Sequence, residues 1–213
     1  MRSNTKNILV IHLIVLLFIL FVYFTPTHFT FLMWNVFLAL LPLDFALLAA
    51  KFQNKFMVLL FALFWLLFFP NTMYMITDFI HLQYISTALD VRYQYFNYSV
   101  LSAGIFIGVT LGVLSMEIML RRFFKHDGDV LKWVCMFALS MLSAFGIYLG
   151  RFLRLNSWDV FTMPKLVWQT VQASMTDHML TFVTLFAGVQ FAILVIYHYG
   201  GRLLTNLTLD KLE

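Results

Sequence analysis

Charged residues are scarce in this chain of 213 residues, because aspartate, glutamate, lysine and arginine together supply only 11% of it. Soluble domains are about a quarter charged, so this composition excludes an ordinary water-soluble protein. There is also only one cysteine, Cys135, which excludes an intrachain disulfide. Apolar residues are abundant instead: 62% of the residues are hydrophobic. This excludes disorder and predicts an all-α polytopic membrane protein that forms one integral membrane domain over residues 1–213.

Six apolar stretches are long enough to cross the hydrocarbon core of a bilayer, which requires roughly 20 residues per helix. They are residues 8–24, 31–50, 56–75, 98–120, 131–150 and 179–199. No small residues suited to a signal peptidase follow the first stretch, where Phe24, Thr25 and Pro26 stand. We therefore expect the first stretch to remain as an uncleaved membrane helix.

Lysine and arginine are distributed unequally between the short loops, and this bias predicts the orientation of the chain. With a cytoplasmic N-terminus, ten of the 14 basic residues lie inside: Arg2, Lys6, Lys51, Lys55, Arg121, Arg122, Lys125, Lys132, Arg202 and Lys211. The outer side keeps Arg92, Arg151, Arg154 and Lys165. The pattern predicts a multi-pass protein of the cell (plasma) membrane with both termini cytoplasmic. It also accounts for the basic residues without a nucleic-acid partner.

Two long outer segments, residues 77–97 and 151–178, carry most of the uncharged polar side chains. In the second, residues 163–175 have apolar side chains on one side and Lys165, Gln169 and Gln172 on the other. We expect a short amphipathic helix at the outer interface, with Thr162 as its N-cap and Pro164 in its first turn.

The third apolar stretch ends in a polar motif. If helix continues beyond Pro70, the side chains of Asn71, Tyr74, Asp78 and His81 share one face, because they are spaced i, i+3, i+7 and i+10. Proline removes a backbone hydrogen bond, so a kink is expected at Pro70.

A second polar motif follows the fifth stretch. At 1.5 Å per residue, Asp78 lies roughly 33 Å along its helix from Phe56, and Arg151 roughly 30 Å from Leu131. Ionisable groups at such depth are costly unless they pair or line a wet cavity. The sequence therefore predicts that Asp78 pairs with Arg151, or with Arg154 one turn later on the same face. Asn156 and Ser157 should end the helix, which brings Asp159 close to the arginines.

The two motifs, from Pro70 to Leu82 and from Gly146 to Asp159, resemble the signature stretches of a family of bacterial multi-pass membrane proteins known as domain of unknown function thirteen-sixty-one. The resemblance covers nearly the whole chain and includes Trp34-Asn35. It departs from the family at Phe96-Asn97, where an aromatic–acid pair is expected. The resemblance implies the fold, the topology and the importance of these residues, but no activity.

Three classes of function remain open for the polar motifs. In an enzyme, His81 would be the general acid or base, oriented by Asp78 or Asp159, and the arginines would stabilise developing negative charge. A binding site would use a larger set of polar groups to hold an anionic, possibly lipid-linked ligand of the outer leaflet: Asn71, Tyr74, Thr77, Arg151, Arg154, Asn156 and Ser157. In a scaffold or accessory subunit, the motifs would only pin the third and fifth helices together.

A metal site is a further alternative, because Asp78 and His81 have a helical ligand spacing that Asp159 or His178 would complete. The arginines favour an anion instead, so we predict no metal, and no cofactor can be named. A transporter is also open, since Asp44 and Glu117 are acids within membrane segments. Arg121 at i+4 is a local partner for Glu117, whereas Asp44 has none nearby in sequence. His12 and His198 are interpreted as packing residues. No protein partner can be named.

Overall fold

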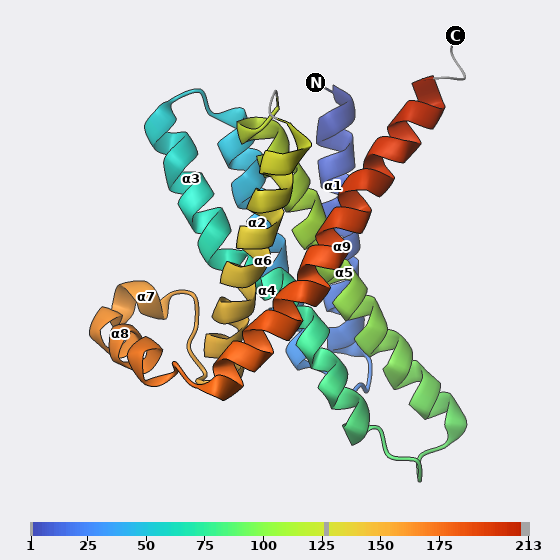
Figure 1. Cartoon of the computed structure of the whole chain (residues 1–213). Coiled ribbons are helices and arrows are strands. Elements are labelled where there is room, and N and C mark those ends of the chain that lie inside the picture. The colour runs from blue at the N-terminus through green and yellow to red at the C-terminus, as the bar shows by residue number, and fades with distance from the viewer. Residues whose placement is uncertain (1, 126–127, 210–213) are drawn as a thin grey trace. The chain divides into compact units, whose positions relative to one another are not determined.

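Helices account for all the regular secondary structure in the computed structural model, which describes residues 2–125 and 128–209 (Figure 1). Within those ranges there is no strand, and six helices are long and apolar enough to cross a membrane. The predicted all-α polytopic membrane fold is therefore confirmed. Lys211, one of the expected inner basic residues, lies outside the described residues.

The chain forms two compact units, Met1–Ser115 and Met116–Glu213, and each is described by itself. The expectation of a single domain over residues 1–213 stays a prediction. The first unit contains α1 (Arg2–Phe24), α2 (Phe31–Lys51), α3 (Lys55–Phe68), α4 (Pro70–Tyr74) and the 3₁₀ helix η1 (Met75–Tyr84). Helix α5 (Val91–Phe123) begins in the first unit and ends in the second. The second also contains α6 (Asp129–Phe152), α7 (Asp159–Thr162), α8 (Pro164–Ala173) and α9 (Asp177–Leu209).

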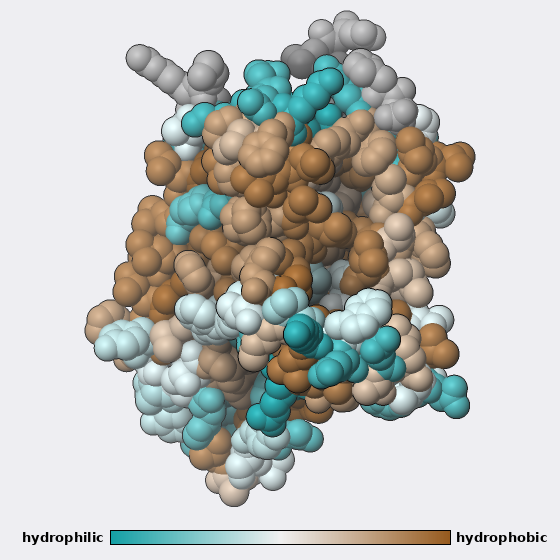
Figure 2. Space-filling view, turned by 90° about the vertical axis from the view of Figure 1, so that its left-hand side faces the viewer, coloured by the Kyte–Doolittle hydropathy of each residue, from teal (hydrophilic) through white to brown (hydrophobic). Residues whose placement is uncertain are grey.

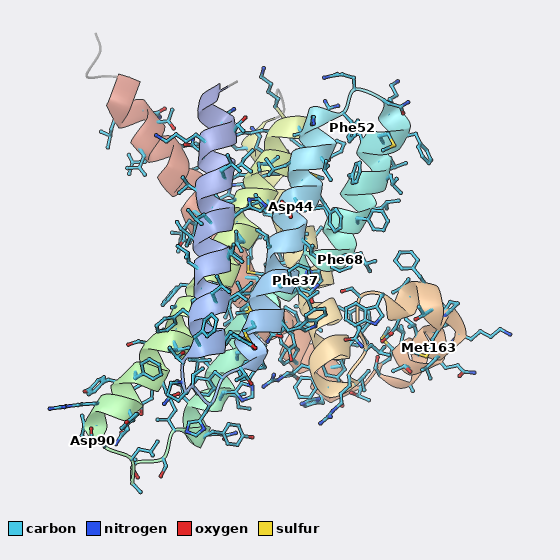
Figure 3. All side chains as sticks on the ribbon, turned by 180° about the vertical axis from the view of Figure 1, so that it is seen from behind. Phe37, Asp44, Phe52, Phe68, Asp90 and Met163 are labelled. Carbon is cyan, nitrogen blue, oxygen red and sulfur yellow. The ribbon has the colours of Figure 1, made fainter. Side chains whose placement is uncertain are left out.

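The outer segment expected at residues 77–97 is mostly helical, because η1 continues to Tyr84 and α5 begins seven residues before the predicted start at residue 98. Asp90 explains this early start (Figure 3). Its carboxylate accepts a hydrogen bond from the backbone N–H of Arg92 at 2.8 Å, and its carbonyl accepts from Tyr93 at 2.9 Å. Asp90 therefore caps the first turn of α5, where backbone donors have no helical partner.

The short helix expected at residues 163–175 is present as α8. Thr162 is not its N-cap: Thr162 ends α7, and its hydroxyl donates to the carbonyl of Trp158 at 3.3 Å. Met163 precedes α8 instead and makes no side-chain capping bond (Figure 3). Pro164 occupies the first helical turn, as expected, because a missing N–H costs nothing there.

In the first unit, α2 and α3 pack side by side (Figure 1), and α1 packs against α2. Asn54 caps α3, since its Oδ1 accepts from the backbone N–H of Phe56 at 2.9 Å. Many leucine and phenylalanine side chains remain exposed on these helices, as on α1, and Figure 2 shows apolar side chains over much of the visible face. Large exposed apolar surfaces are the expected boundary with lipid.

A kink was predicted at Pro70, and the helix is interrupted there, because α3 ends at Phe68 and α4 starts at Pro70. Two side chains donate hydrogen bonds to backbone carbonyls at this interruption. The Asn71 amide donates to the Phe68 carbonyl at 2.9 Å, and the Thr72 hydroxyl donates to the Phe69 carbonyl at 2.8 Å. In a membrane such bonds are needed, since no water is present to satisfy freed backbone groups.

Two glycines of α5 allow the broken helix to approach closely. A Cβ at Gly112 would lie 2.4 Å from Thr72 Oγ1, and one at Gly108 would lie 2.4 Å from Met75 Cγ. Gly104, Gly108 and Gly112 are four residues apart, which is the small-residue spacing that lets membrane helices pack closely. This contact positions the end of α4 and the start of η1.

In the second unit, α6 packs along α9 in the opposite direction. Trp133 donates to the Tyr199 hydroxyl at 2.6 Å near one end, whereas Tyr148 lies beside His178 near the other, with ring centroids 5.7 Å apart. The buried cluster between them contains Ala144 and Ala187. The C-terminal part of α6, which carries the second polar motif, is thereby packed against the start of α9.

We predict that Gly108→Ala and Gly112→Ala each lower the free energy of unfolding by about 1–3 kcal/mol, because the added methyl group overlaps Met75 or Thr72. Thermal unfolding of the purified variants in one detergent measures this. Gly188→Ala is the matched control, since a Cβ there meets nothing within 4 Å. Equal stability of the Gly112 and Gly188 variants would contradict the close approach.

Candidate functional site

The carboxylate of Asp78 is buried in the first unit, with 1% of the residue exposed. It lies in η1, three residues after Met75, which is itself fixed against α5. The side-chain amide of Asn35 on α2 donates a hydrogen bond to Asp78 Oδ2 at 2.8 Å. A buried carboxylate needs such donors, because its transfer out of water is otherwise very costly.

His81 lies one 3₁₀ turn beyond Asp78, with its Nε2 3.7 Å from Asp78 Oδ1. Its ring is half-buried among aromatic rings, with centroid distances of 4.5 Å to Phe31 and 5.6 Å to Tyr84. The carboxylate and the rings together restrict the orientation of the imidazole. An oriented imidazole beside a carboxylate is an arrangement that general acid–base catalysis requires.

The predicted α-helical face of Asn71, Tyr74, Asp78 and His81 is wrong in its geometry. Residues 70–74 are α-helical, but residues 75–84 form a 3₁₀ helix, in which side chains at i and i+3 eclipse. The aligned positions are therefore Met75, Asp78, His81 and Tyr84. The depth estimate for Asp78 changes little, because only residues 75–78 of that path have the 3₁₀ rise of about 2.0 Å per residue.

The remaining residues of the first motif make local bonds. The hydroxyl of Thr77 donates to the Tyr74 carbonyl at 2.7 Å, and Asn71 bonds the carbonyl of Phe68 at the helix break. These contacts stabilise the transition from α3 to η1. A role of Asn71, Tyr74 or Thr77 in ligand binding stays a prediction.

The second motif departs from the predicted helix at Arg154. Helix α6 ends at Phe152, and Arg154 has φ of 55°, the one positive φ at a non-glycine residue in the described chain. Arg154 therefore does not continue the helical face of Arg151, contrary to the sequence prediction. The chain folds back here, so that a Cβ at Gly150 would lie 3.4 Å from the carbonyl oxygen of Leu155.

Asp159 closes the turn that follows. Its Oδ2 accepts from the backbone N–H of Asn156 at 2.7 Å and from the Asn156 amide at 3.3 Å, while its own N–H donates to the Asn156 carbonyl at 3.0 Å. Asp159 is buried, and Ser157 is half-buried within the turn. The Asn156-x-x-Asp159 spacing is thus explained by the hydrogen bonds between these two residues, which close the turn. The expected catalytic role of Asp159 and ligand-binding roles of Asn156 and Ser157 stay predictions.

Asp78 and His81 belong to the first unit, whereas Arg151, Arg154 and Asp159 belong to the second. The pairing of Asp78 with Arg151 or Arg154 therefore stays a prediction. His178, the other proposed completion of a metal site, lies 3.4 Å from the Tyr148 hydroxyl through Nδ1. Among residues 2–125 and 128–209, no group of three His, Cys, Asp or Glu side chains is placed to hold a metal ion.

Sequence reasoning missed Asn35 as a partner of the site, although an amide in an otherwise apolar helix was a usable signal. It also missed that His12 and His198, which were interpreted as packing residues, are the histidine partners of Asp44 and Glu117. Asp44 Oδ1 lies 2.8 Å from His12 Nε2, and Glu117 Oε1 lies 2.6 Å from His198 Nδ1 (Figure 3 labels Asp44). The expected Arg121 partner of Glu117 is present but longer, at 3.9 Å.

The family model described as protein of unknown function (DUF1361) matches residues 34–193, which include both polar motifs and Asn35. No curated protein and no solved structure is significantly similar to the chain.

We predict that Asp78→Asn and Asn35→Leu each lower the free energy of unfolding by about 1.5–3 kcal/mol, because the first removes the charge of a buried hydrogen bond and the second removes its donor. The double variant should lose less than the sum of the two. A double-mutant cycle of unfolding free energies measures this coupling. Strictly additive losses would show that the contact between Asn35 and Asp78 contributes nothing.

Proposed function

The chain belongs to the DUF1361 family of proteins of unknown function, and from that premise we propose that it binds an anionic, lipid-linked ligand at an outward-facing interfacial site. The anion would be held by Arg151 and Arg154 of the second unit. In this proposal the protein lies in the cell membrane with both termini cytoplasmic, as the distribution of lysine and arginine predicts. The ligand would enter from the outer leaflet.

The observation that carries the proposal is the backbone conformation of Arg154. A left-handed conformation costs a non-glycine residue of order 1–2 kcal/mol, and glycine adopts it without this cost. Position 154 directly follows a helix end, where glycine is the usual residue. An arginine that keeps this unfavourable backbone conformation at residue 154 supports a function for the arginine side chain. A guanidinium is suited to bidentate binding of phosphate or carboxylate.

The surroundings of Arg154 support the same conclusion. Arg151 lies in the last turn of α6, three residues earlier, and the turn beyond is fixed by Asp159. The bonds of Asp159 thus fix the turn that follows Arg154. Pre-organised cations lose less side-chain entropy when a ligand binds. A scaffold in which the motifs only hold helices together would have no need for a strained arginine.

A catalytic version of this function is favoured by one further contact, the 3.7 Å approach of His81 Nε2 to Asp78 Oδ1. A carboxylate at this distance from an imidazole favours one orientation of the ring. In that version His81, oriented by Asp78, would move a proton on a bound outer-leaflet lipid, in phosphoryl or acyl-group chemistry.

We predict that Arg154→Gly raises the free energy of unfolding by about 1 kcal/mol, because it relieves the left-handed strain. The same variant should lose the thermal stabilisation that phosphatidylglycerol confers on the wild-type protein in neutral detergent. Differential scanning calorimetry of both proteins measures the two effects together, as the melting temperature without additive and its change when phosphatidylglycerol, phosphatidylcholine or inorganic phosphate is added. A response to phosphate as well would identify the headgroup anion, rather than the acyl chains, as the recognised part.

Arg92→Asn is the matched control, since it removes an arginine from the exposed start of α5 in the first unit. It should leave the phosphatidylglycerol response unchanged. If Arg154→Gly stabilises the protein and still responds to phosphatidylglycerol like the wild type, the ligand site does not include Arg154 and the proposal fails.

A further inference from the structure

The membrane-spanning part of the second unit contains an unusual set of buried polar atoms. Among the described residues, four buried side-chain atoms have no hydrogen-bond partner: Ser143 Oγ, Gln190 Nε2, Gln190 Oε1 and His198 Nε2. Ser143 belongs to α6 and the other two residues belong to α9, so all four atoms lie in one unit. Buried polar groups without partners are rare and often mark a functional position.

His198 is the chemically informative member of this set. Its Nδ1 lies 2.6 Å from Glu117 Oε1, so the Nδ1–H donates to the carboxylate. In the neutral tautomer that this bond selects, Nε2 carries a lone pair and no proton. The residue is buried, and Nε2 has no partner. An imidazole held by a carboxylate, with its other nitrogen open, is a proton acceptor with its counter-ion in place.

The pair of His12 and Asp44 in the first unit provides a contrast. Both ring nitrogens of His12 are occupied: Nδ1 lies 2.9 Å from the Ile8 carbonyl and Nε2 lies 2.8 Å from Asp44 Oδ1. This histidine links α1 to α2. Both of its partners are acceptors, so both contacts are hydrogen bonds only when each ring nitrogen carries a proton, and neither nitrogen is then left open. The two carboxylate–imidazole pairs are thus chemically different, although both lie within apolar helices.

Gln190 extends the polar set along α9. It lies eight residues before His198, which is about 12 Å along a helix. It also lies three residues after Ala187, which packs in the same buried cluster as Ala144, the neighbour of Ser143. The Ser143 hydroxyl on α6 and the Gln190 amide on α9 are thus at about the same level along the two helices. Groups that both donate and accept hydrogen bonds are suited to bind water and pass a proton between waters.

We propose that Glu117 and His198 form a proton-binding site, and that Gln190 and Ser143 continue it as a proton path along α9. A proton from water binds the lone pair of His198 Nε2, and the Glu117 carboxylate neutralises the imidazolium that forms. Loss of the same proton from Nε2 restores the starting pair. Nothing is oxidised or reduced, and the net charge of the pair changes between minus one and zero. Proton relays through membranes use acids and histidines in this way.

The charged groups around the pair leave this exchange possible. Arg121 of α5 reaches Glu117 only at 3.9 Å, and its side chain is 80% exposed, so it does not neutralise the carboxylate. Arg202 of α9 is bound to Asp129 of α6 at 2.8 Å. The Tyr199 ring lies edge-on to His198, with centroids 5.2 Å apart. The nearby arginines thus have other partners or face solvent.

Proton uptake into lipid vesicles tests the proposal. Purified full-length protein is reconstituted into vesicles of phosphatidylethanolamine and phosphatidylglycerol that contain the pH dye pyranine, and a potassium diffusion potential drives protons inward. Wild-type vesicles should acidify at least tenfold faster than protein-free vesicles. Glu117→Gln should abolish the difference, because glutamine still accepts the Nδ1 hydrogen bond but supplies no negative charge. His198→Gln should do the same.

Two further variants separate a proton path from a purely structural role. Gln190→Leu should slow acidification at least tenfold and also raise the melting temperature, because it removes two buried unpartnered polar atoms. His12→Gln is the matched control, since it alters the closed pair and should leave acidification unchanged. Wild-type vesicles that acidify no faster than protein-free ones overturn the proposal. It is equally overturned if Glu117→Gln or Gln190→Leu, correctly folded by its melting curve, keeps the wild-type rate.

Discussion

The close contact of the broken third membrane segment with glycines 108 and 112 is the constraint on which the first unit depends. Pro70 ends one helix and starts another, and Asn71 and Thr72 bond the carbonyls at the break. The chain can then continue as η1 only where a neighbouring helix has no side chain in the way, and Gly112 provides that space. The result is that Asp78 is buried at a place where Asn35 of α2 can donate to it.

Much of the fold was predictable from the sequence, because hydrocarbon imposes a minimum length on every apolar helix. The six segments follow from that requirement alone. Their ends do not, because an end is set by single residues: Asp90 caps α5 seven residues before the predicted start at residue 98, within the stretch 77–97 whose polar side chains predict an outer segment. The change from α to 3₁₀ geometry at Met75 had no signal in the side-chain pattern, which fits both periods at i and i+3.

The backbone geometry around the candidate residues was not predictable from the sequence, and their roles stay predictions. Unusual polar side chains in apolar surroundings identified Asp78, His81, Arg151 and Arg154, since each is costly to place there without a reason. The left-handed backbone at Arg154 was not predictable, because arginine has no preference for that conformation. Asn35 and Asp78 are 43 residues apart in sequence, and such a contact follows only from how the helices pack.

The two units treat their buried polar groups differently. In the first, the polar groups at the helix break and the His12–Asp44 pair all have partners, and no described buried side-chain atom there is without one. Such closed bonds hold helices in one arrangement, because opening any of them in lipid leaves a polar group unsatisfied. In the second unit, the amide of Gln190 and Nε2 of His198 are buried without this compensation. A fold that satisfies its polar groups elsewhere has no structural reason to retain these. Their cost is therefore most simply explained by a species that binds them and leaves again, and the proton is the smallest that a carboxylate-held imidazole can accept.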